Sequence, residues 1–291
     1  MTPTSTPTKA ELLAEVAGLA SPPHTCTRVM ALIHDERADV SAIGDVIAQD
    51  TSLATRLLRL VNSSFYNFPR QIDTLSRAIA IVGLNDLHTL VVAVSAVDAF
   101  SRLGNRQIDM ESFWRHSLYT AMLSRELGRR GHYPLPERLF VTGLLHDVGL
   151  LMICNQLGDM EQGLIRDANG DEDTLQALER DTFGFDHGEL GGEILGAWQL
   201  PATITGGVRY HHRPDVAGAH QGEASYIWVA DLLAHQIQGA GLFRGITVEL
   251  PGFQEELLAT VGMTRGGIDL DGLIDKVNDE FAEVHSHIHP R

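Results

Sequence analysis

The chain has 291 residues and carries 22 Lys and Arg against 38 Asp and Glu, a formal net charge of −16. This length allows one large or two ordinary domains, and 44% hydrophobic with 21% charged residues is typical of a globular protein. The acidic balance argues against binding to a nucleic-acid polymer or an anionic membrane surface, because both need clustered Lys and Arg.

Residues 1–15 are polar and rich in Thr and Pro, with no apolar region ahead of a cleavage site. They predict a flexible leader and not a signal peptide. The longest apolar stretch, residues 87–100, is interrupted by polar side chains and is shorter than the roughly 20 apolar residues that a membrane span needs. Cys26 and Cys154 are too few for a disulfide framework. We expect a cytoplasmic protein without membrane insertion.

The first part of the chain has a helical hydrophobic period. Helices are expected over residues 41–50, 51–64, 74–83 and 85–100. The second of these has one apolar face, at Leu53, Leu57, Leu58 and Val61. Ser41 and Thr74 are suited to cap the helices that they precede, and Gly83 is suited to end the third.

Residues 101–110 show no helical stripe and predict a connector between two lobes. Beyond it, helices are expected over residues 111–131, 136–153, 172–184, 186–199, 201–212 and 223–236. No strand or hairpin signal is present, so we predict an all-α fold of two helical lobes. The expected divisions are a leader (1–15), an N-terminal lobe (16–105), a second lobe (106–240) and a C-terminal extension (241–291).

The second lobe contains an ordered set of histidines and aspartates in separate predicted helices. Its members are His116, His146, Asp147, His187, His211, His212 and Asp231. Neutral imidazoles and ionised carboxylates are ligands for borderline divalent metals. Their apolar surroundings mean that the two carboxylates need partners, since a buried ionised Asp is costly unless it is paired or coordinated. Two cations bridged by one carboxylate would suit phosphoester hydrolysis.

Other polar residues have a structural reading as well as a functional one. A single histidine on an apolar helix face, such as His88, His132 or His235, is interpreted as a hydrogen-bonded core or surface residue. Asn62 and Ser63 can satisfy carbonyls at a helix end, and Phe65 beside them can pack. The alternative is that Asn62, Ser63 and Phe65 form a partner-binding surface, because exposed polar loops often carry recognition.

Several segments together resemble the HD phosphohydrolase superfamily, and the N-terminal lobe is similar to its HDOD signalling branch. The second lobe contributes FWRHS, GLLHDVG, ERDTFGFDHGELGGEIL and VRYHHRP. The N-terminal lobe contributes LASPPHTCTRVMALI, LATRLLRLVNSSFYNFP and LSRAIAIVGLNDLHTLVV. The resemblance covers residues 16–240 and implies that the second lobe is an HD-type helical bundle.

The resemblance implies a regulatory module of bacterial signal transduction, because HDOD proteins act mainly in that way. The related HD-GYP branch hydrolyses cyclic di-GMP with two or three metals. Carried over to this chain, one metal position matches His116, His146, Asp147 and Asp231. Asp147 would be shared with a second position, formed by His187, His211 and His212. We therefore expect one or two divalent ions (Fe, Mn, Zn or Ni), with Asp147 as the catalytic residue of any reaction.

Three departures count against hydrolysis of cyclic di-GMP. Leu150 stands where HD-GYP enzymes have a phosphate-binding Lys. The GYP element does not follow His212. Ser112 stands where some members have a Glu that supports a third metal.

Three hypotheses remain open at this point, and with them the question of whether the chain is an enzyme. The first is a signalling module that acts through protein–protein contacts, with signalling proteins or a nucleotide second messenger as partners. The second is a metal-dependent phosphohydrolase acting on a nucleotide or a cyclic dinucleotide such as cyclic di-GMP. The third is a structural HD fold in which the histidines only donate and accept hydrogen bonds.

Overall fold

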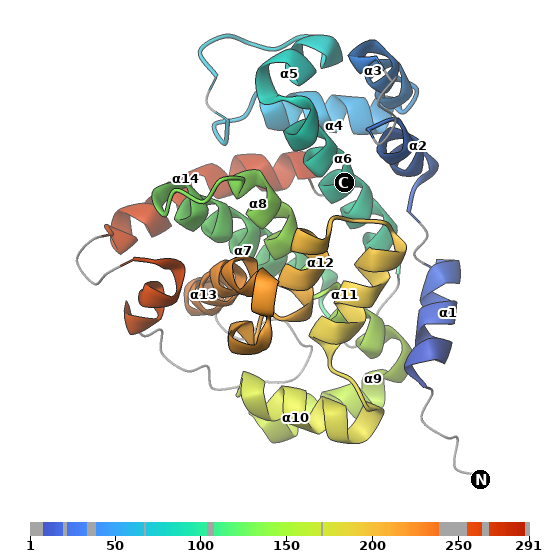
Figure 1. Cartoon of the computed structure of the whole chain (residues 1–291), viewed down its shortest axis with the longest axis vertical. Coiled ribbons are helices and arrows are strands. Elements are labelled where there is room, and N and C mark those ends of the chain that lie inside the picture. The colour runs from blue at the N-terminus through green and yellow to red at the C-terminus, as the bar shows by residue number, and fades with distance from the viewer. Residues whose placement is uncertain are drawn as a thin grey trace. The chain divides into compact units, whose positions relative to one another are not determined.

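The computed structural model describes residues 8–19, 22–33, 39–66, 68–103, 108–169, 171–238, 255–263 and 268–288 (Figure 1). Within these ranges the chain is helical and has no strand. The predicted all-α fold is therefore confirmed. The chain divides into two compact units: a larger unit of residues 1–21 and 103–270, and a smaller unit of residues 22–102 and 271–291.

The smaller unit is built from α2 (His24–Ile33), α3 (Val40–Ala48), α4 (Thr51–Val61), α5 (Leu75–Val82), α6 (Leu84–Ser101) and α14 (Leu270–Ile288). Helix α4 packs against α3, α5 and α6. Its buried face is Leu53, Leu57, Leu60 and Val61. Leu60 thus takes the place predicted for Leu58, because positions i, i+4, i+7 and i+8 share one helix face.

The helix ends in the smaller unit follow the polar residues around them. Thr74 caps α5 by accepting the Arg77 N–H, and Gly83 ends that helix with a φ of 94°, as the sequence predicted. Helix α3 begins earlier than expected, because the cap is Asp39, whose carboxylate accepts the Ser41 N–H.

The Asn62 side chain connects the end of α4 to the segment that precedes α5. Its Nδ2 donates to the carbonyl oxygens of Leu58 and Ile72, and its Oδ1 accepts the Ile72 N–H, each at 2.7 Å. We expect Asn62→Ala to lower the free energy of unfolding by about 2 kcal/mol, because the part-buried Ile72 groups lose their partner. Urea denaturation measures this. Gln71→Ala, exposed in the same segment, should change stability by less than about 0.5 kcal/mol; equal effects of the two variants would contradict the assigned role of Asn62.

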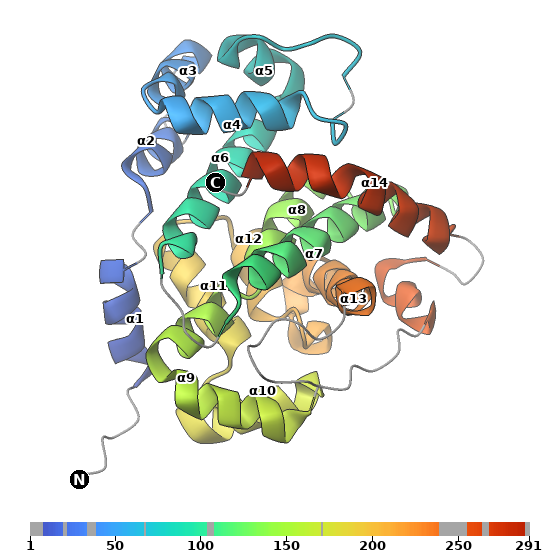
Figure 2. The same ribbon diagram turned by 180° about the vertical axis from the view of Figure 1, so that it is seen from behind.

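The larger unit contains α1 (Lys9–Leu19), α7 (Met110–Arg130), α8 (Pro136–Leu145), α9 (Val148–Ala168), α10 (Glu172–Phe183), α11 (His187–Ala197), α12 (Ala202–Arg209) and α13 (Gln221–Gln238). Three short 3-10 helices accompany them: η1 (Pro214–Val216), η2 (Gly218–His220) and η3 (Glu255–Val261). Helices α7, α8 and α13 pack together, as Figure 2 shows for α7 and α13. Helix α11 packs against both α9 and α12.

A helix lies where the sequence predicted a leader up to residue 15. Helix α1 packs on α11. Lys9 Nζ lies 2.9 Å from Glu189 Oε1 and 2.9 Å from Glu193 Oε1 of that helix. The Leu12 side chain is buried. Burial of one apolar side chain and two ion pairs orders this segment, although its composition alone favours disorder. Residues 1–7 of the predicted leader, and residues 241–254 at the start of the predicted extension, lie outside the described part.

The helix predicted over residues 136–153 is interrupted in its middle. Helix α8 ends at Leu145, and α9 begins at Val148, so that His146 and Asp147 form the turn between them. His146 Nδ1 donates to the Gly143 carbonyl oxygen at 2.7 Å, the oxygen that the Asp147 N–H would use in an unbroken helix. The backbone leaves helical geometry at Asp147, where φ is −100° and ψ is 11°.

The segment Pro136–Ala168 is long and apolar enough to suit a membrane span, but 89% of its apolar window is buried within the protein. Burial of this kind is typical of a core segment in a water-soluble domain.

Candidate metal centre

All seven histidines and aspartates singled out in the sequence meet inside the larger unit. His116 comes from the middle of α7, and His146 and Asp147 come from the turn between α8 and α9. His187 is the first residue of α11, His211 and His212 follow α12, and Asp231 lies on α13. The fold thus brings together side chains from five separate parts of the sequence.

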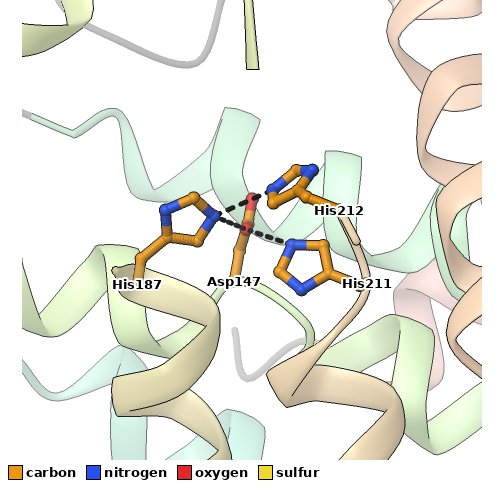
Figure 3. A group of neighbouring side chains, drawn as sticks. All are labelled: Asp147, His187, His211 and His212. Atoms are coloured by element: carbon orange, nitrogen blue, oxygen red, sulfur yellow. Dashed lines mark hydrogen bonds and ion pairs between the residues drawn. The ribbon is translucent and has the colours of Figure 1, made fainter. Parts of the chain in front are cut away.

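Asp147 is the centre of one half of the cluster, which we call the Asp147 group: Asp147, His187, His211 and His212. The three imidazoles surround the carboxylate (Figure 3). Asp147 Oδ1 lies 3.8 Å from His187 Nε2 and 3.7 Å from His211 Nε2. His187 Nε2 also lies 2.9 Å from His212 Nε2. One ligand atom from each of the four residues falls within 4.8 Å of all the others, which is compact enough to hold one metal ion.

Asp231 is the centre of the other half. Its Oδ1 lies 2.9 Å from His116 Nε2 and 3.5 Å from His146 Nε2. The same His146 atom lies 3.3 Å from Asp147 Oδ2, so His146 stands between the two carboxylates. The two oxygens of Asp147 therefore face different histidines, which is the arrangement of a bridging carboxylate.

His235 also belongs to this half, although the sequence reading treated it as a core or surface histidine. Its Nε2 lies 3.5 Å from Asp231 Oδ1, and its ring centroid lies 4.3 Å from that of His116. We call His116, Asp231 and His235 the Asp231 group; their ligand atoms also lie within 4.8 Å of one another. The available signal was the spacing of Asp231 and His235, four residues apart on one helix, which places both on the same face.

Backbone carbonyls fix how the central imidazoles point. His146 Nδ1 donates to the Gly143 carbonyl oxygen, and His211 Nδ1 donates to the Val208 carbonyl oxygen at 2.6 Å. A carbonyl oxygen can only accept, so Nδ1 carries the proton in both rings. In the neutral form of each ring, the Nε2 atom that faces the carboxylates then offers its lone pair to a metal, which would replace any proton held there.

Glu179 of α10 orients His187 and was not found from the sequence. Both of its oxygens lie 2.8 Å from His187 Nδ1, and one accepts the His187 backbone N–H at 2.9 Å. The Glu179 side chain is fully buried. The turn at Gly184 brings this buried Glu to a histidine eight residues later in the sequence. The hydrophobic period predicts the two helices on either side of the turn, but it does not predict that the two side chains meet.

Burial and charge set the protonation of the cluster. Burial raises the pKa values of Asp147 and Asp231, but the neighbouring histidines hold both pKa values well below the usual range. Burial lowers the pKa of His146, yet Asp147 and Asp231 raise it to about 10. Burial and nearby histidines lower the pKa of His212, and they lower the pKa of His235 to about 4. Two ionised carboxylates thus favour positive charge among imidazoles, some of which are kept neutral.

Four buried atoms at the centre make no hydrogen bond of normal geometry: Nε2 of His116, His146 and His211, and Oδ1 of Asp231. Buried polar atoms are normally satisfied, and leaving several unsatisfied in one place is costly. Each of the four belongs to one of the compact histidine and aspartate groups described above. The residues present therefore fit one or two divalent cations.

Two side chains near the centre bear on phosphate binding. Leu150, at the position of the HD-GYP lysine, is buried in the core. Arg209 Nη2 lies 3.6 Å from Glu193 Oε1, and its Nη1 lies 4.0 Å from Glu189 Oε1. Its charge is therefore largely compensated by two carboxylates.

The predicted partner-binding residues lie in the smaller unit, and the contacts of Asn62 and Ser63 there are structural. Ser63 and Phe65 are buried, and the Ser63 hydroxyl donates to the Leu60 carbonyl oxygen. Asn62 is exposed to solvent, but its side-chain amide donates hydrogen bonds to the carbonyl oxygens of Leu58 and Ile72. The alternative structural reading, in which these residues satisfy carbonyls at the end of a helix, describes Asn62 and Ser63.

Comparison with known proteins gives one family model and several relatives. The model of the HDOD domain matches residues 19–214. An uncharacterized protein of Treponema pallidum (strain Nichols) is 24% identical over 251 residues, which is 83% of this chain and 48% of the relative. This chain thus spans about half the length of that curated relative.

Two crystal structures share the fold. The first, named "Putative phosphohydrolase" and from Shewanella amazonensis SB2B, is 24% identical, with a TM-score of 0.71 over 95% of this chain and 97% of the other. The second, named "Putative signal transduction protein" and from Marinobacter aquaeolei VT8, is 20% identical, with a TM-score of 0.69 over 94% of this chain and 61% of the other. At these identities the likeness shows the fold alone.

Proposed function

The chain belongs to the HDOD domain family, and from this premise we propose that it is a regulatory module of bacterial signal transduction. It acts through protein–protein contacts and carries an HD-type centre for divalent cations in its larger unit. Its partners are signalling proteins or a nucleotide second messenger. Its buried free cysteines, Cys26 and Cys154, suit the reducing cytoplasm. Signal transduction is also the role in the name of one structure with the same fold.

The observation that carries the proposal is the convergence of buried imidazole Nε2 atoms on two carboxylates, with four central atoms lacking hydrogen bonds. A purely structural role for the histidines leaves these atoms unsatisfied. One cation would be held by the Asp147 group, and the other by Asp231 with His116 and His146. Asp147 would be shared between them. A donor set dominated by imidazole favours Fe, Mn, Zn or Ni over Mg or Ca.

A regulatory role is favoured over hydrolysis by the surroundings of the centre. Leu150 offers no charge to a phosphate, and the Arg209 charge is compensated by Glu189 and Glu193. A chain can retain a metal centre after it has lost the groups that recognise a substrate, because metal binding and substrate binding use different residues.

One observation favours a second candidate, a metal-dependent phosphohydrolase acting on a nucleotide or a cyclic dinucleotide such as cyclic di-GMP. The two oxygens of Asp147 face different histidines, as a carboxylate between two cations does. Divalent cations would supply the positive charge that stabilises a phosphoryl transition state, and they would lower the pKa of water. Asp147 would then position both cations. Another structure with the same fold bears the name of a phosphohydrolase.

The test combines elemental analysis of untagged protein with assays on a generic phosphodiester and on cyclic di-GMP. Bound metal without turnover is the expected result and supports the regulatory module. Bound metal with turnover that Asp147→Asn abolishes would replace it with the phosphohydrolase. Protein that binds no Fe, Mn, Zn or Ni, even after incubation with the metals, would refute both.

Glu179→Gln is expected to lower the affinity of the Asp147 group for its cation, without lowering the affinity of the Asp231 group. The amide keeps the size of the side chain but removes the charge that orients His187, and loss of such an outer partner typically costs about 10–100-fold in metal affinity. Chelator competition followed by elemental analysis measures the loss. Asp181→Asn, an exposed change on the same α10, should leave both cations in place. A Glu179→Gln protein with the parent affinity would show that this contact does not support the metal.

A further inference from the structure

We propose that His235 is a metal ligand, and that it completes the coordination of the cation at Asp231. This inference rests on the metal centre proposed above. Neither the ordered histidine–aspartate pattern of the sequence nor the resemblance to HD proteins assigns this residue a role. It enters the site because α13 carries both Asp231 and His235.

The position of His235 is that of a ligand. Its Nε2 is one of three imidazole nitrogens that converge on Asp231 Oδ1, at 2.9 Å (His116), 3.5 Å (His146) and 3.5 Å (His235). A carboxylate oxygen has two lone pairs and cannot accept three hydrogen bonds well. Asp231 Oδ1 in fact makes none of normal geometry, and neither do the His116 and His146 nitrogens. Two buried nitrogens and one carboxylate oxygen without hydrogen bonds, with His235 Nε2 3.5 Å from that oxygen, are explained by a cation among the four atoms.

The rings around Asp231 also leave little room for another role. His235 lies 4.3 Å from the His116 ring, with 31° between the ring planes. The His235 side chain is 18% exposed and so lies at the edge of the buried cluster. Two imidazoles held so close to each other, beside a carboxylate, can both direct a lone pair to the same point. His116 is 3% exposed and Asp231 is 1% exposed, so the point on which they converge is shielded from solvent.

The number of protein ligands distinguishes a closed structural metal site from an open catalytic one. With the shared Asp147, the Asp231 half of the centre already offers four protein ligands, which are His116, His146, Asp147 and Asp231, and His235 is a fifth. Structural zinc sites use four protein ligands in a closed tetrahedron, whereas catalytic sites keep one position open for water or substrate. His235 therefore occupies a coordination position that would otherwise be open to water or substrate, which suits a cation that stabilises or senses.

The experiment uses the full chain, stripped of metal and loaded with Co²⁺ as the probe. The parent protein should bind about two Co²⁺ per chain. His235→Gln should lose one of them or bind it at least about 10-fold more weakly, with a changed visible d–d absorption. Gln236→Ala, the next residue on the same helix, is the matched control and should keep the parent stoichiometry and spectrum. Thermal melts of the metal-free proteins verify that all variants are folded.

A second variant separates ligation from packing. His235→Cys places a thiolate near the same cation, and a Co²⁺–thiolate bond produces a charge-transfer absorption that the parent cannot show. Its appearance supports ligation by residue 235. If both His235 variants bind Co²⁺ with the parent stoichiometry, affinity and spectrum, the inference is overturned while the proposed centre stands. If the parent itself binds no Co²⁺, the proposed centre fails and the inference fails with it.

Discussion

Asp147→Asn is expected to empty the centre of both cations, a loss of more than about 100-fold in affinity for each, since outer-shell partners alone account for 10–100-fold. Asp147 Oδ1 faces His187 and His211, and Oδ2 faces His146. The amide keeps the size of the side chain, but it removes the negative charge and replaces one ligand oxygen by a donor that repels a cation. Elemental analysis of untagged protein, with chelator competition, measures the effect.

The control for Asp147→Asn is Asp159→Asn. Asp159 is exposed on the same α9, so its substitution changes the net charge equally without touching the cluster. It should retain the metal content of the parent. An Asp147→Asn protein that keeps one tightly bound cation would show that Asp147 serves a single metal position and does not bridge two.

Gly149→Ala is expected to destabilise the chain by about 3 kcal/mol or more, at the upper end of overpacking effects. A Cβ at Gly149 would lie 1.9 Å from the His187 carbonyl oxygen and 2.7 Å from the Gly191 nitrogen. Both are backbone atoms of α11, so no side chain can rotate away and α9 must move from α11. That movement separates Asp147 from His187, so metal at the Asp147 group should be lost as well. Urea denaturation and elemental analysis measure the two effects.

The same helix offers a matched substitution. Gly163 lies on α9 with no atom within 4 Å of an added Cβ. Gly163→Ala should therefore stabilise the chain by about 0.5–1 kcal/mol, because Ala has the higher helix propensity. If Gly149→Ala were as stable as Gly163→Ala and still bound metal, close contact of α9 with α11 would not be what positions the site.

Much of the fold could be predicted because it depends on local rules. The period of apolar residues predicted the helices, and single residues such as Thr74 and Gly83 predicted where α5 begins and ends. The clustering of the seven histidines and aspartates was also predictable, because buried ionisable residues in several apolar helices need common partners. The break between α8 and α9 was not, since it depends on the bond from His146 to Gly143.

The residues that sequence reasoning missed depend on tertiary contacts. Glu179 reaches His187 only because the chain turns between α10 and α11. His235 is one of several histidines in helical segments, and only the packing of α13 on α7 brings it to His116. Phe65 was compatible with packing or with a partner-binding surface, and it is buried. For each of these residues, the local sequence pattern is equally compatible with a tertiary contact and with exposure to solvent.

Asp147 also stands at a helix start, and there it differs from the other aspartates in that position. Asp39, Asp50, Asp109, Asp171 and Asp186 each accept a backbone N–H from the first turn of the helix that they precede. Asp147 precedes α9 without making such a bond, because its oxygens are turned to the histidines. A missing cap typically forgoes about 1 kcal/mol of folding free energy. A variant in which residue 147 caps α9 would therefore gain stability to heat, and it would lose the carboxylate that we propose to hold both cations.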